Sequence, residues 1–107
     1  MPGRPEIVCL CGSTRFEEQL RAANRDLTFA GVIVVAPGVF ARVDASQSDE
    51  AITPAQKAAL GELHLRKIDL ADRVLVVNPA GYIGESTSRE IDYARATGKP
   101  ITFTEPG

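Results

Sequence analysis

The chain has 107 residues, of which 44% are apolar and 24% charged, a composition typical of one folded domain and unlike that of a disordered chain. Its net charge of -2 predicts no attraction to a nucleic acid polymer or to an anionic membrane, and no apolar run approaches the ~20 residues of a membrane span. The N-terminus does not read as a signal peptide, so we expect a cytoplasmic protein. A small domain buries a modest share of its surface, which favours assembly into a homodimer or a larger homo-oligomer.

The first part of the chain predicts a strand, a helix and a second strand. Residues 6–11 form a nearly continuous apolar run, which is typical of a strand covered on both faces. Apolar side chains then recur every three or four residues through a helix, in which Thr14 and Glu17 fit a capping box and Gly31 fits the residue after the C-terminus. Residues 32–36 are the second strand.

A long connection separates the second strand from a second helix. Residues 37–52 are rich in Asp, Ser, Gln and Glu, and a loop of this length in a small domain predicts a lid or a mobile segment. Thr53, Pro54 and Gln56 then supply an N-cap, a first-turn proline and a capping-box glutamine, so the helix should run to about residue 71. The remaining predicted elements are a strand over residues 73–78, a helix over residues 86–97 and a strand over residues 101–104.

Strands that alternate with helices predict a parallel sheet with right-handed crossovers. We therefore expect one α/β domain over residues 1–107, with three Rossmann-like layers and four strands in the order 2-1-3-4. That order places a topological switch between strands 1 and 3. The loops over residues 12–15 and 79–87 then face each other across a crevice, where open α/β sheets bind ligands.

The loop after the first strand is a candidate phosphate site. Gly12 permits a tight turn, Ser13 and Thr14 offer hydroxyls beside the N–H groups of a helix N-terminus, and Arg15 is a bidentate donor. The same residues also fit a simple helix cap made by Ser13 or Thr14.

A carboxylate and several hydroxyls stand at the start of the third helix. Glu90 adjoins Ile91 on the helical wheel and so leans towards the sheet and the crevice. Held there, it can attack a sugar carbon while its hydroxyl neighbours Ser86, Thr87 and Ser88 hold a phosphate. Alternatively, the segment from Thr87 to Glu90 fits a capping box, in which the carboxylate only reaches back to the N-cap.

The remaining candidate residues have simpler interpretations. His64, the single histidine, lies on the apolar side of the second helix, as a packing residue would. Cys9 and Cys11 share one face of a strand and lack the spacing of a zinc site, so we expect buried, reduced thiols and neither a metal nor a cofactor. Phe40 and Tyr82 can stack on a base, or they can belong to the core or its rim.

Two segments resemble a known enzyme family. Cys11-Gly-Ser-Thr-Arg15 resembles the Cys-Gly-Ser-x-Arg turn of the 2′-deoxynucleoside 5′-phosphate N-hydrolases. Glu90-Ile-Asp-Tyr-Ala94 resembles the Glu-[Ile/Leu]-Gly-Tyr-Ala segment of the related nucleoside 2-deoxyribosyltransferases. The resemblance implies a nucleoside deoxyribosyltransferase-like domain with a flavodoxin-like fold, assembly into dimers or larger oligomers, and a nucleoside or nucleotide substrate.

The resemblance also implies roles for individual residues. Glu90 would be a nucleophile that attacks C1′ of the sugar, displaces the base and leaves a glycosyl ester, which water or a second base then resolves. Ser13 and Arg15 would bind the 5′-phosphate, with Ser86 or Ser88 assisting. We therefore predict hydrolysis of the N-glycosidic bond of a (deoxy)nucleoside 5′-monophosphate, with base transfer as the alternative. The base itself stays unassigned.

One position departs from the family pattern. Family members carry an aspartate that helps to orient the sugar and the leaving base where this chain has His64. This change favours an alternative of another class, a nucleotide-binding or sensing module without turnover, although histidine also performs acid–base work near neutral pH. His64 is about ten residues into its helix, roughly 15 Å from the ligand edge, which argues against contact. The family's aspartate reaches the site from the same position, so we predict that His64 points towards Glu90.

Overall fold

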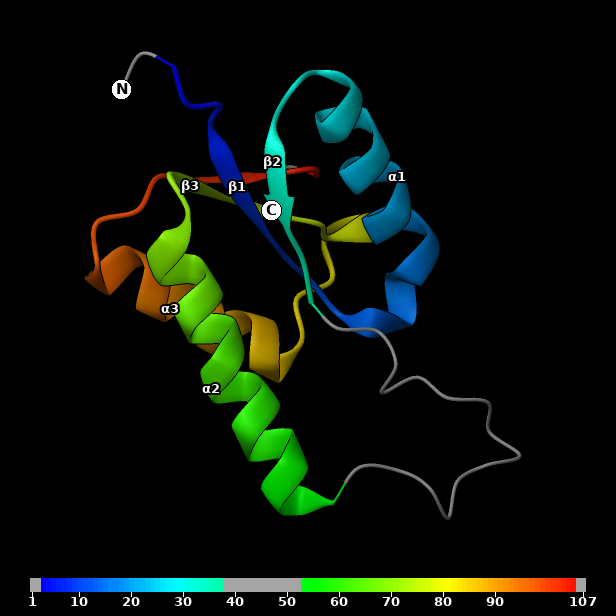
Figure 1. Ribbon diagram of the computed structural model, residues 1–107. Coiled ribbons are helices and arrows are strands. Elements are labelled where there is room, and N and C mark those ends of the chain that lie inside the picture. The colour runs from blue at the N-terminus through cyan, green and yellow to red at the C-terminus, as the bar shows by residue number, and fades with distance from the viewer. Residues whose placement is uncertain (1–2, 38–52, 106–107) are drawn as a thin grey trace.

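The structure is a computed structural model that describes residues 3–37 and 53–105 (Figure 1). Within these residues, no helix has both the length and the apolar character that a membrane span requires. Most of the predicted loop over residues 37–52 lies outside the described residues, as does Phe40, so the expectations for both stay predictions.

One parallel sheet forms the centre of the fold. Its strands are β1 (Ile7–Cys11), β2 (Ile33–Val35), β3 (Arg73–Val76) and β4 (Ile101–Phe103). Their order is β2-β1-β3-β4 and every neighbouring pair is parallel, which confirms the predicted four-stranded sheet. The connecting helices are α1 (Glu17–Phe29), α2 (Pro54–Leu70) and α3 (Glu85–Ala96).

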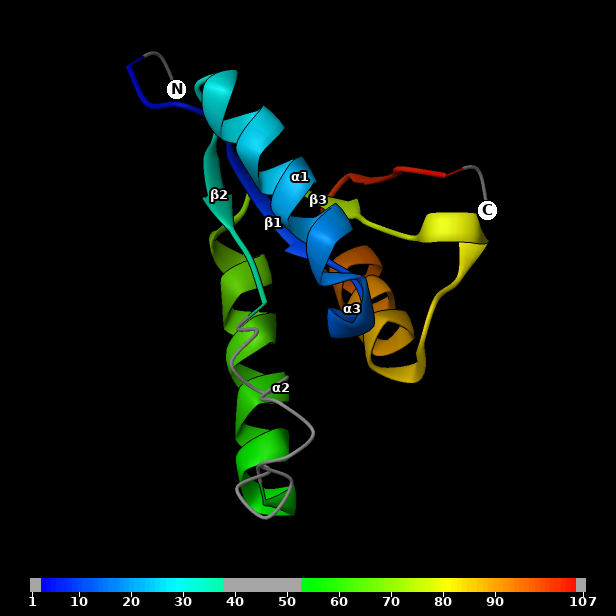
Figure 2. The same cartoon turned by 90° about the vertical axis from the view of Figure 1, so that its right-hand side faces the viewer.

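The helices cover both faces of the sheet, α1 on one face and α2 with α3 on the other (Figures 1 and 2). Successive side chains of a strand point to opposite faces. β1 therefore contributes Val8 and Leu10 to the core beneath α1, and Cys9 and Cys11 to the core beneath α2 and α3. All four side chains are fully buried, as the apolar run of this strand predicts.

The predicted start of α2 is confirmed. The Thr53 hydroxyl accepts a hydrogen bond from the Gln56 backbone N–H at 3.0 Å, and the Gln56 side chain accepts one from the Thr53 backbone at 2.9 Å. These two bonds are the reciprocal contacts of a capping box. The helix begins beyond the carboxyl-terminal end of the sheet, so its first turns project from the domain (Figure 2). Residues 53–59 are exposed, and His64 is the first buried residue of the helix.

The predicted capping box of α1 is wrong. A tight 3₁₀ turn over Thr14–Phe16 follows β1, and the Ser13 hydroxyl caps this turn by accepting from the Arg15 N–H at 3.3 Å. α1 begins only at Glu17, which is therefore the first residue of the α-helix rather than its third. At the other end, Gly31 follows the C-cap with a positive φ of 87°, as a C′ glycine does.

Hydrogen bonds of the Asn78 side chain join the end of β3 to the residues that follow β4. Its side chain is fully buried. The amide nitrogen donates to the Glu105 carbonyl at 3.1 Å, while the amide oxygen accepts from the Glu105 backbone at 2.9 Å and from the Thr104 hydroxyl at 3.2 Å. These bonds fix the point at which the loop between β3 and α3 begins.

Asp72 joins the starts of β1 and β3. Its carboxylate accepts two hydrogen bonds from the Arg4 guanidinium, at 2.9 and 3.1 Å, and one from the Ile7 backbone at 2.8 Å. The bonds from Arg4 and from the backbone lower the pKa of Asp72 to about 2, with a smaller contribution from the charge of Lys99. An Asp in an unfolded chain titrates near pH ~3.9, so the folded state holds this carboxylate ionised to lower pH than the unfolded state does.

We predict that Asp72→Asn lowers the free energy of unfolding at neutral pH and that this loss disappears in acid. Because the folded pKa is depressed, the stabilising contribution is present above the unfolded pKa and is lost as the pH falls from about 4 to about 2. Urea unfolding of both proteins across this pH range measures the difference. Asp92→Asn, on the exposed side of α3, is the control and should change stability little. A deficit in Asp72→Asn that is the same at every pH would contradict the prediction.

Candidate functional site

The carboxyl ends of β1 and β3 meet so closely that only glycine fits between them. The Val77 N–H donates to the Cys11 carbonyl at 2.8 Å and continues the ladder past the last paired strand residues. A Cβ atom on Gly12 would lie 2.8 Å from the Val77 carbonyl oxygen, a separation that side-chain carbons do not adopt. Gly12 therefore lets the two candidate loops leave the sheet side by side.

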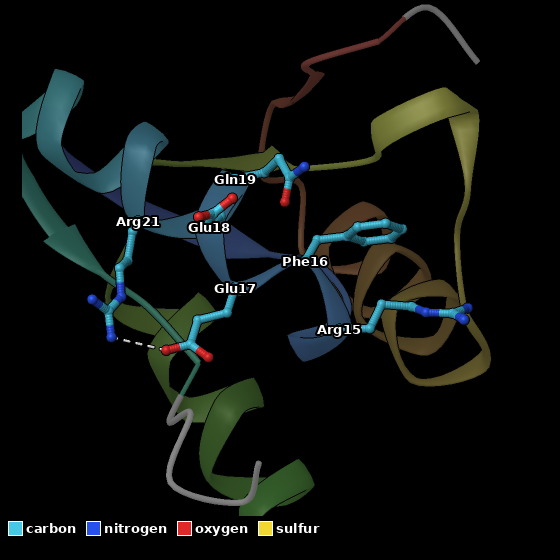
Figure 3. A pocket seen from close by; sticks show the side chains of 6 residues that line it. All are labelled: Arg15, Phe16, Glu17, Glu18, Gln19 and Arg21. Atoms are coloured by element: carbon cyan, nitrogen blue, oxygen red, sulfur yellow. Dashed lines mark hydrogen bonds and ion pairs between the residues drawn. The ribbon is translucent and has the colours of Figure 1, made fainter. Parts of the chain in front are cut away.

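Aromatic and cationic side chains join these two loops. The Phe16 and Tyr82 rings meet edge to face, with centroids 5.6 Å apart and an interplanar angle of 68°. The Arg15 guanidinium carbon lies 4.9 Å from the centroid of the Tyr82 ring, a cation–π contact. Arg15 is thus directed towards the loop between β3 and α3, as Figure 3 also shows, while its side chain stays exposed.

The start of α3 removes one interpretation of Glu90. The helix begins at Glu85, Gly84 is its N-cap, and no side chain caps it. The capping box proposed for Thr87 and Glu90 is therefore wrong, because Glu90 lies beyond the first turn and Thr87 is buried at 3% exposure. The carboxylate of Glu90 is free for contacts outside its own helix end.

Glu90 belongs to a compact group of polar side chains, which we call the His64 cluster: Cys9, Cys11, His64 and Glu90. The Nε2 atom of His64 lies 3.7 Å from Glu90 Oε1, 3.3 Å from Cys11 Sγ and 3.7 Å from Cys9 Sγ. The His64 side chain is 5% exposed and that of Glu90 is 16% exposed. The cluster is therefore buried, and Glu90 is its most accessible member.

The cysteines are the part of this cluster that sequence reasoning missed. Both are buried and free, as expected, but they meet the histidine. The signal was present in their spacing, because two side chains at i and i+2 share the sheet face on which the helix bearing His64 packs. Among the described residues, the donor atoms of Cys9, Cys11 and His64 lie within 4.8 Å of one another and can hold a metal ion.

Mutual contacts and burial shift the pKa values of the cluster. Hydrogen bonds from Cys11 and His64 lower the pKa of the Cys9 thiol, whereas the pKa of Cys11 is raised by its bond to Cys9, by burial and by the charge of Glu90. Burial lowers the pKa of His64, but its bond to Cys9 and the charge of Glu90 outweigh burial and raise it. Burial raises the pKa of Glu90, and the charge of His64 offsets part of this increase.

The other predicted site residues lie in the two loops and at the start of α3 and have fewer contacts. Ser13 makes the capping bond already described, and Thr14 opens the 3₁₀ turn. Ser86 and Ser88 lie in the first turns of α3 and are exposed. Tyr82 is 42% exposed, with Arg15 over its ring. Their roles in binding a phosphate, a sugar or a base stay predictions.

A surface hollow of ≈ 540 Å³ lies over the start of α1 (Figure 3). The hollow shares Arg15 with the candidate site but includes neither Glu90 nor His64. The hollow therefore lies apart from the His64 cluster, and none of the four side chains of that cluster lines it. Its lining residues are Arg15, Phe16, Glu17, Glu18, Gln19 and Arg21.

Comparison with known proteins supports the architecture. No family model and no curated protein matches the sequence. Among solved structures, the chain resembles a 2-deoxyribosyltransferase from the psychrotolerant bacterium Bacillus psychrosaccharolyticus, described as a biocatalyst for the synthesis of antiviral and antitumoral nucleosides. The TM-score is 0.67, and the match covers 91% of this chain and 70% of that chain at 17% identity. At this identity the likeness establishes a shared fold, so the expected flavodoxin-like arrangement of three layers is confirmed.

We predict that Gly12→Ala destabilises the fold by about 1–3 kcal/mol, because the added methyl group overlaps a backbone carbonyl that cannot rotate away. Gly61→Ala is the matched control. Gly61 lies inside α2 and a Cβ atom there meets nothing within 4 Å, so this change should stabilise by about 0.5–1 kcal/mol. Urea unfolding of the two variants measures both effects. Equal stability of Gly12→Ala and the parent protein would refute the close approach of the two strand ends.

Proposed function

We propose that this protein hydrolyses the N-glycosidic bond of a (deoxy)nucleoside 5′-monophosphate and that Glu90 is the nucleophile. The supporting observation is the Glu90 carboxylate, which contacts His64 at 3.7 Å at the edge where the ends of β1 and β3 meet. The structural neighbour is a 2-deoxyribosyltransferase described as a biocatalyst for the synthesis of nucleosides. The carboxylate and the fold together favour glycosyl transfer through a covalent intermediate.

The reaction would proceed in two displacements. A Glu90 carboxylate oxygen forms a bond to C1′ of the sugar while the bond from C1′ to the base nitrogen breaks, and its electron pair leaves with the base, which takes a proton from solvent. A water molecule then attacks C1′ from the opposite side and loses a proton to solvent. The ester bond breaks, which returns the carboxylate and releases the sugar phosphate.

His64 would act through Glu90 and not on the substrate. Its imidazole is almost fully covered, so the substrate would meet the carboxylate before the ring. A positively charged imidazole beside the carboxylate would hold its orientation and favour its ionised form between the two displacements. We therefore assign His64 as a positioning residue, in the place where the family that the chain resembles carries an aspartate.

The 5′-phosphate would bind at the first loop. Gly12, Ser13 and Thr14 surround the N-terminal turn that follows β1, where backbone N–H groups attract anions. Arg15 has no acidic partner among the described residues and lies exposed over Tyr82, so its guanidinium is available to a phosphate beside the second loop. Ser86 and Ser88, exposed on α3, would assist from the opposite side, and Tyr82 would contribute to base or sugar binding.

Two alternatives differ in what happens at Glu90. A deoxyribosyltransferase would pass the sugar to a second base instead of water, as the name of the structural neighbour suggests. A nucleotide sensor would bind the ligand without releasing the base. The residues proposed to bind the phosphate, at the first loop, favour the hydrolase. Recognition of the 5′-phosphate would distinguish a nucleotide from a nucleoside.

Assembly into a homodimer or larger oligomer also stays a proposal. Leu63 and Leu70 on α2 are 50% and 67% exposed, and Phe29 at the end of α1 is 82% exposed. Large apolar side chains exposed on either helix are features that a second copy of the chain would cover.

The direct test is release of free base from nucleosides and their 5′-monophosphates, followed by chromatography. We predict that Glu90→Gln, which keeps the shape of the side chain but removes the nucleophile, lowers turnover by about 10³-fold or more. Glu85→Gln changes an exposed carboxylate of the same helix and should retain full activity. Normal turnover by a folded Glu90→Gln protein would eliminate the nucleophile assignment, and no release of base by the parent protein from any substrate would favour the sensor.

We further predict that Arg15→Ala raises KM for a nucleoside 5′-monophosphate by about 10- to 100-fold, the value of one or two hydrogen bonds to a charged group. The unphosphorylated nucleoside serves as the internal comparison, because losing the contact with Tyr82 alone would affect both substrates. Arg21→Ala, an arginine of α1, is the control for charge. An equal loss for nucleoside and nucleotide would exclude Arg15 as a phosphate ligand.

A further inference from the structure

We propose that the His64 cluster is a binding site for a thiophilic divalent cation, zinc above all, with Cys9, Cys11 and His64 as three ligands and Glu90 as the fourth. This site goes beyond the glycosidase proposal and does not depend on it.

Three donor atoms, from Cys9, Cys11 and His64, lie within 4.8 Å of one another inside the domain, and Glu90 Oε1 lies beside the same imidazole. Two sulfurs and one carboxylate oxygen lie within 3.3 to 3.7 Å of a single imidazole nitrogen, His64 Nε2. A neutral or charged ring offers only one hydrogen at that nitrogen, so it can donate to one of the three neighbours at a time. A cation placed among the four atoms satisfies all of them together.

The spacing of these atoms fits tetrahedral zinc. Zinc binds sulfur at about 2.3 Å and imidazole nitrogen at about 2.0–2.1 Å, so the ligand atoms of a tetrahedral site lie roughly 3.4–3.8 Å apart. The distances from His64 Nε2 to Cys11 Sγ, Cys9 Sγ and Glu90 Oε1 are 3.3, 3.7 and 3.7 Å. The distances from His64 Nε2 therefore match those of a tetrahedral site, while the donor atoms of Cys9, Cys11 and His64, which lie within 4.8 Å of one another, would draw closer around the ion.

The donor set selects the metal. Two thiolates and an imidazole are soft or borderline ligands, which favour zinc over magnesium or calcium, whose ligands are oxygen atoms. One carboxylate oxygen completes a four-coordinate site.

Three elements hold the ligands and leave one approach. The two cysteines belong to β1, His64 to α2 and Glu90 to α3, and the first three are at most 4% exposed. The partly exposed carboxylate of Glu90 marks the side from which an ion enters. An ion bound there would cross-link the sheet to both helices on this face, so binding would stabilise the fold.

Metal binding and glycosidase chemistry compete at Glu90. Zinc on one carboxylate oxygen withdraws electron density from the whole group and makes the other oxygen a weaker nucleophile towards C1′ of a sugar. A zinc-loaded protein would therefore be less active as a glycosidase, and a chelator would restore activity. The base-release assays belong in the presence of a chelator for this reason.

The experiment is a cobalt and zinc titration of the tag-free protein under reducing conditions. The chain contains two cysteines and one histidine, so thiolate-to-cobalt charge-transfer absorption can arise only from Cys9 and Cys11. We expect this absorption, together with the visible bands of tetrahedral cobalt, to saturate at one ion per chain and to disappear when zinc is added. The midpoint of thermal unfolding should rise with zinc concentration. Titration without charge-transfer absorption would overturn the proposal and identify the cluster as hydrogen-bonded.

Variants locate the ligands. Loss of an outer partner weakens a metal site by about 10- to 100-fold, so His64→Ala should weaken zinc binding by about 100-fold or more, and Cys9→Ser should remove half of the thiolate signal. Glu90→Gln should weaken binding and shift the visible cobalt bands, while Glu85→Gln should change neither. Unchanged affinity in a folded His64→Ala protein would overturn the site, and unchanged affinity in Glu90→Gln would remove the fourth ligand. If a variant fails to fold, the cobalt spectrum of the parent protein still shows whether Cys9 and Cys11 bind the ion.

Discussion

Parallel pairing of β1 with β3 is the constraint on which the rest of the molecule depends. The register joins Val8 to Arg73 and Cys11 to Val76, although these partners lie far apart in sequence. Both strands therefore end at the same edge, and the chain leaves them through two loops that run side by side. Gly12 is the local condition for this arrangement, since any Cβ atom at that position would meet the Val77 carbonyl oxygen. The aromatic contact between Phe16 and Tyr82 follows from the same proximity.

The alternation of β1 explains why a polar cluster can exist in so small a core. One face of the strand carries Val8 and Leu10, which pack beneath α1 in an ordinary apolar layer. The other face carries Cys9 and Cys11, whose small polarisable side chains leave room for an imidazole from α2. A buried imidazole is tolerated only when its nitrogens have partners. Within the described part of the chain, no buried side-chain nitrogen or oxygen lacks one.

The sequence was sufficient for the sheet because its signals are strong and local. Apolar runs, a full capping box at Thr53 and glycines at helix ends each point to the same element order. The starts of α1 and α3 were predicted less well, since several hydroxyl residues compete for each cap and sequence does not rank them. At α1 Ser13 caps a 3₁₀ turn instead, and at α3 no side chain caps the helix at all.

The depth of His64 shows what periodicity alone cannot determine. Counting residues along the helix puts this side chain far from the ligand edge only if α2 begins level with the ends of the strands. The helix instead begins well beyond them (Figure 2). Ten residues in, His64 therefore arrives beside Cys11, the last residue of β1. The resemblance to a family with an acidic residue at this position gave the better prediction, because it carries tertiary information that spacing lacks.

The cluster also connects stability with chemistry. Glu90 is the one member with access to solvent, so whatever the inner three side chains bind decides whether its carboxylate is available to a substrate. When no metal is bound and His64 is protonated, its positive charge would hold the Glu90 carboxylate in its ionised form. With a metal, the same carboxylate becomes a ligand and the fold gains a cross-link. Replacing any one of the four changes the partners of the other three, so the effects of single substitutions on stability and on activity will not add. Double-variant comparisons between His64 and Glu90 are therefore more informative about either role than the single changes are.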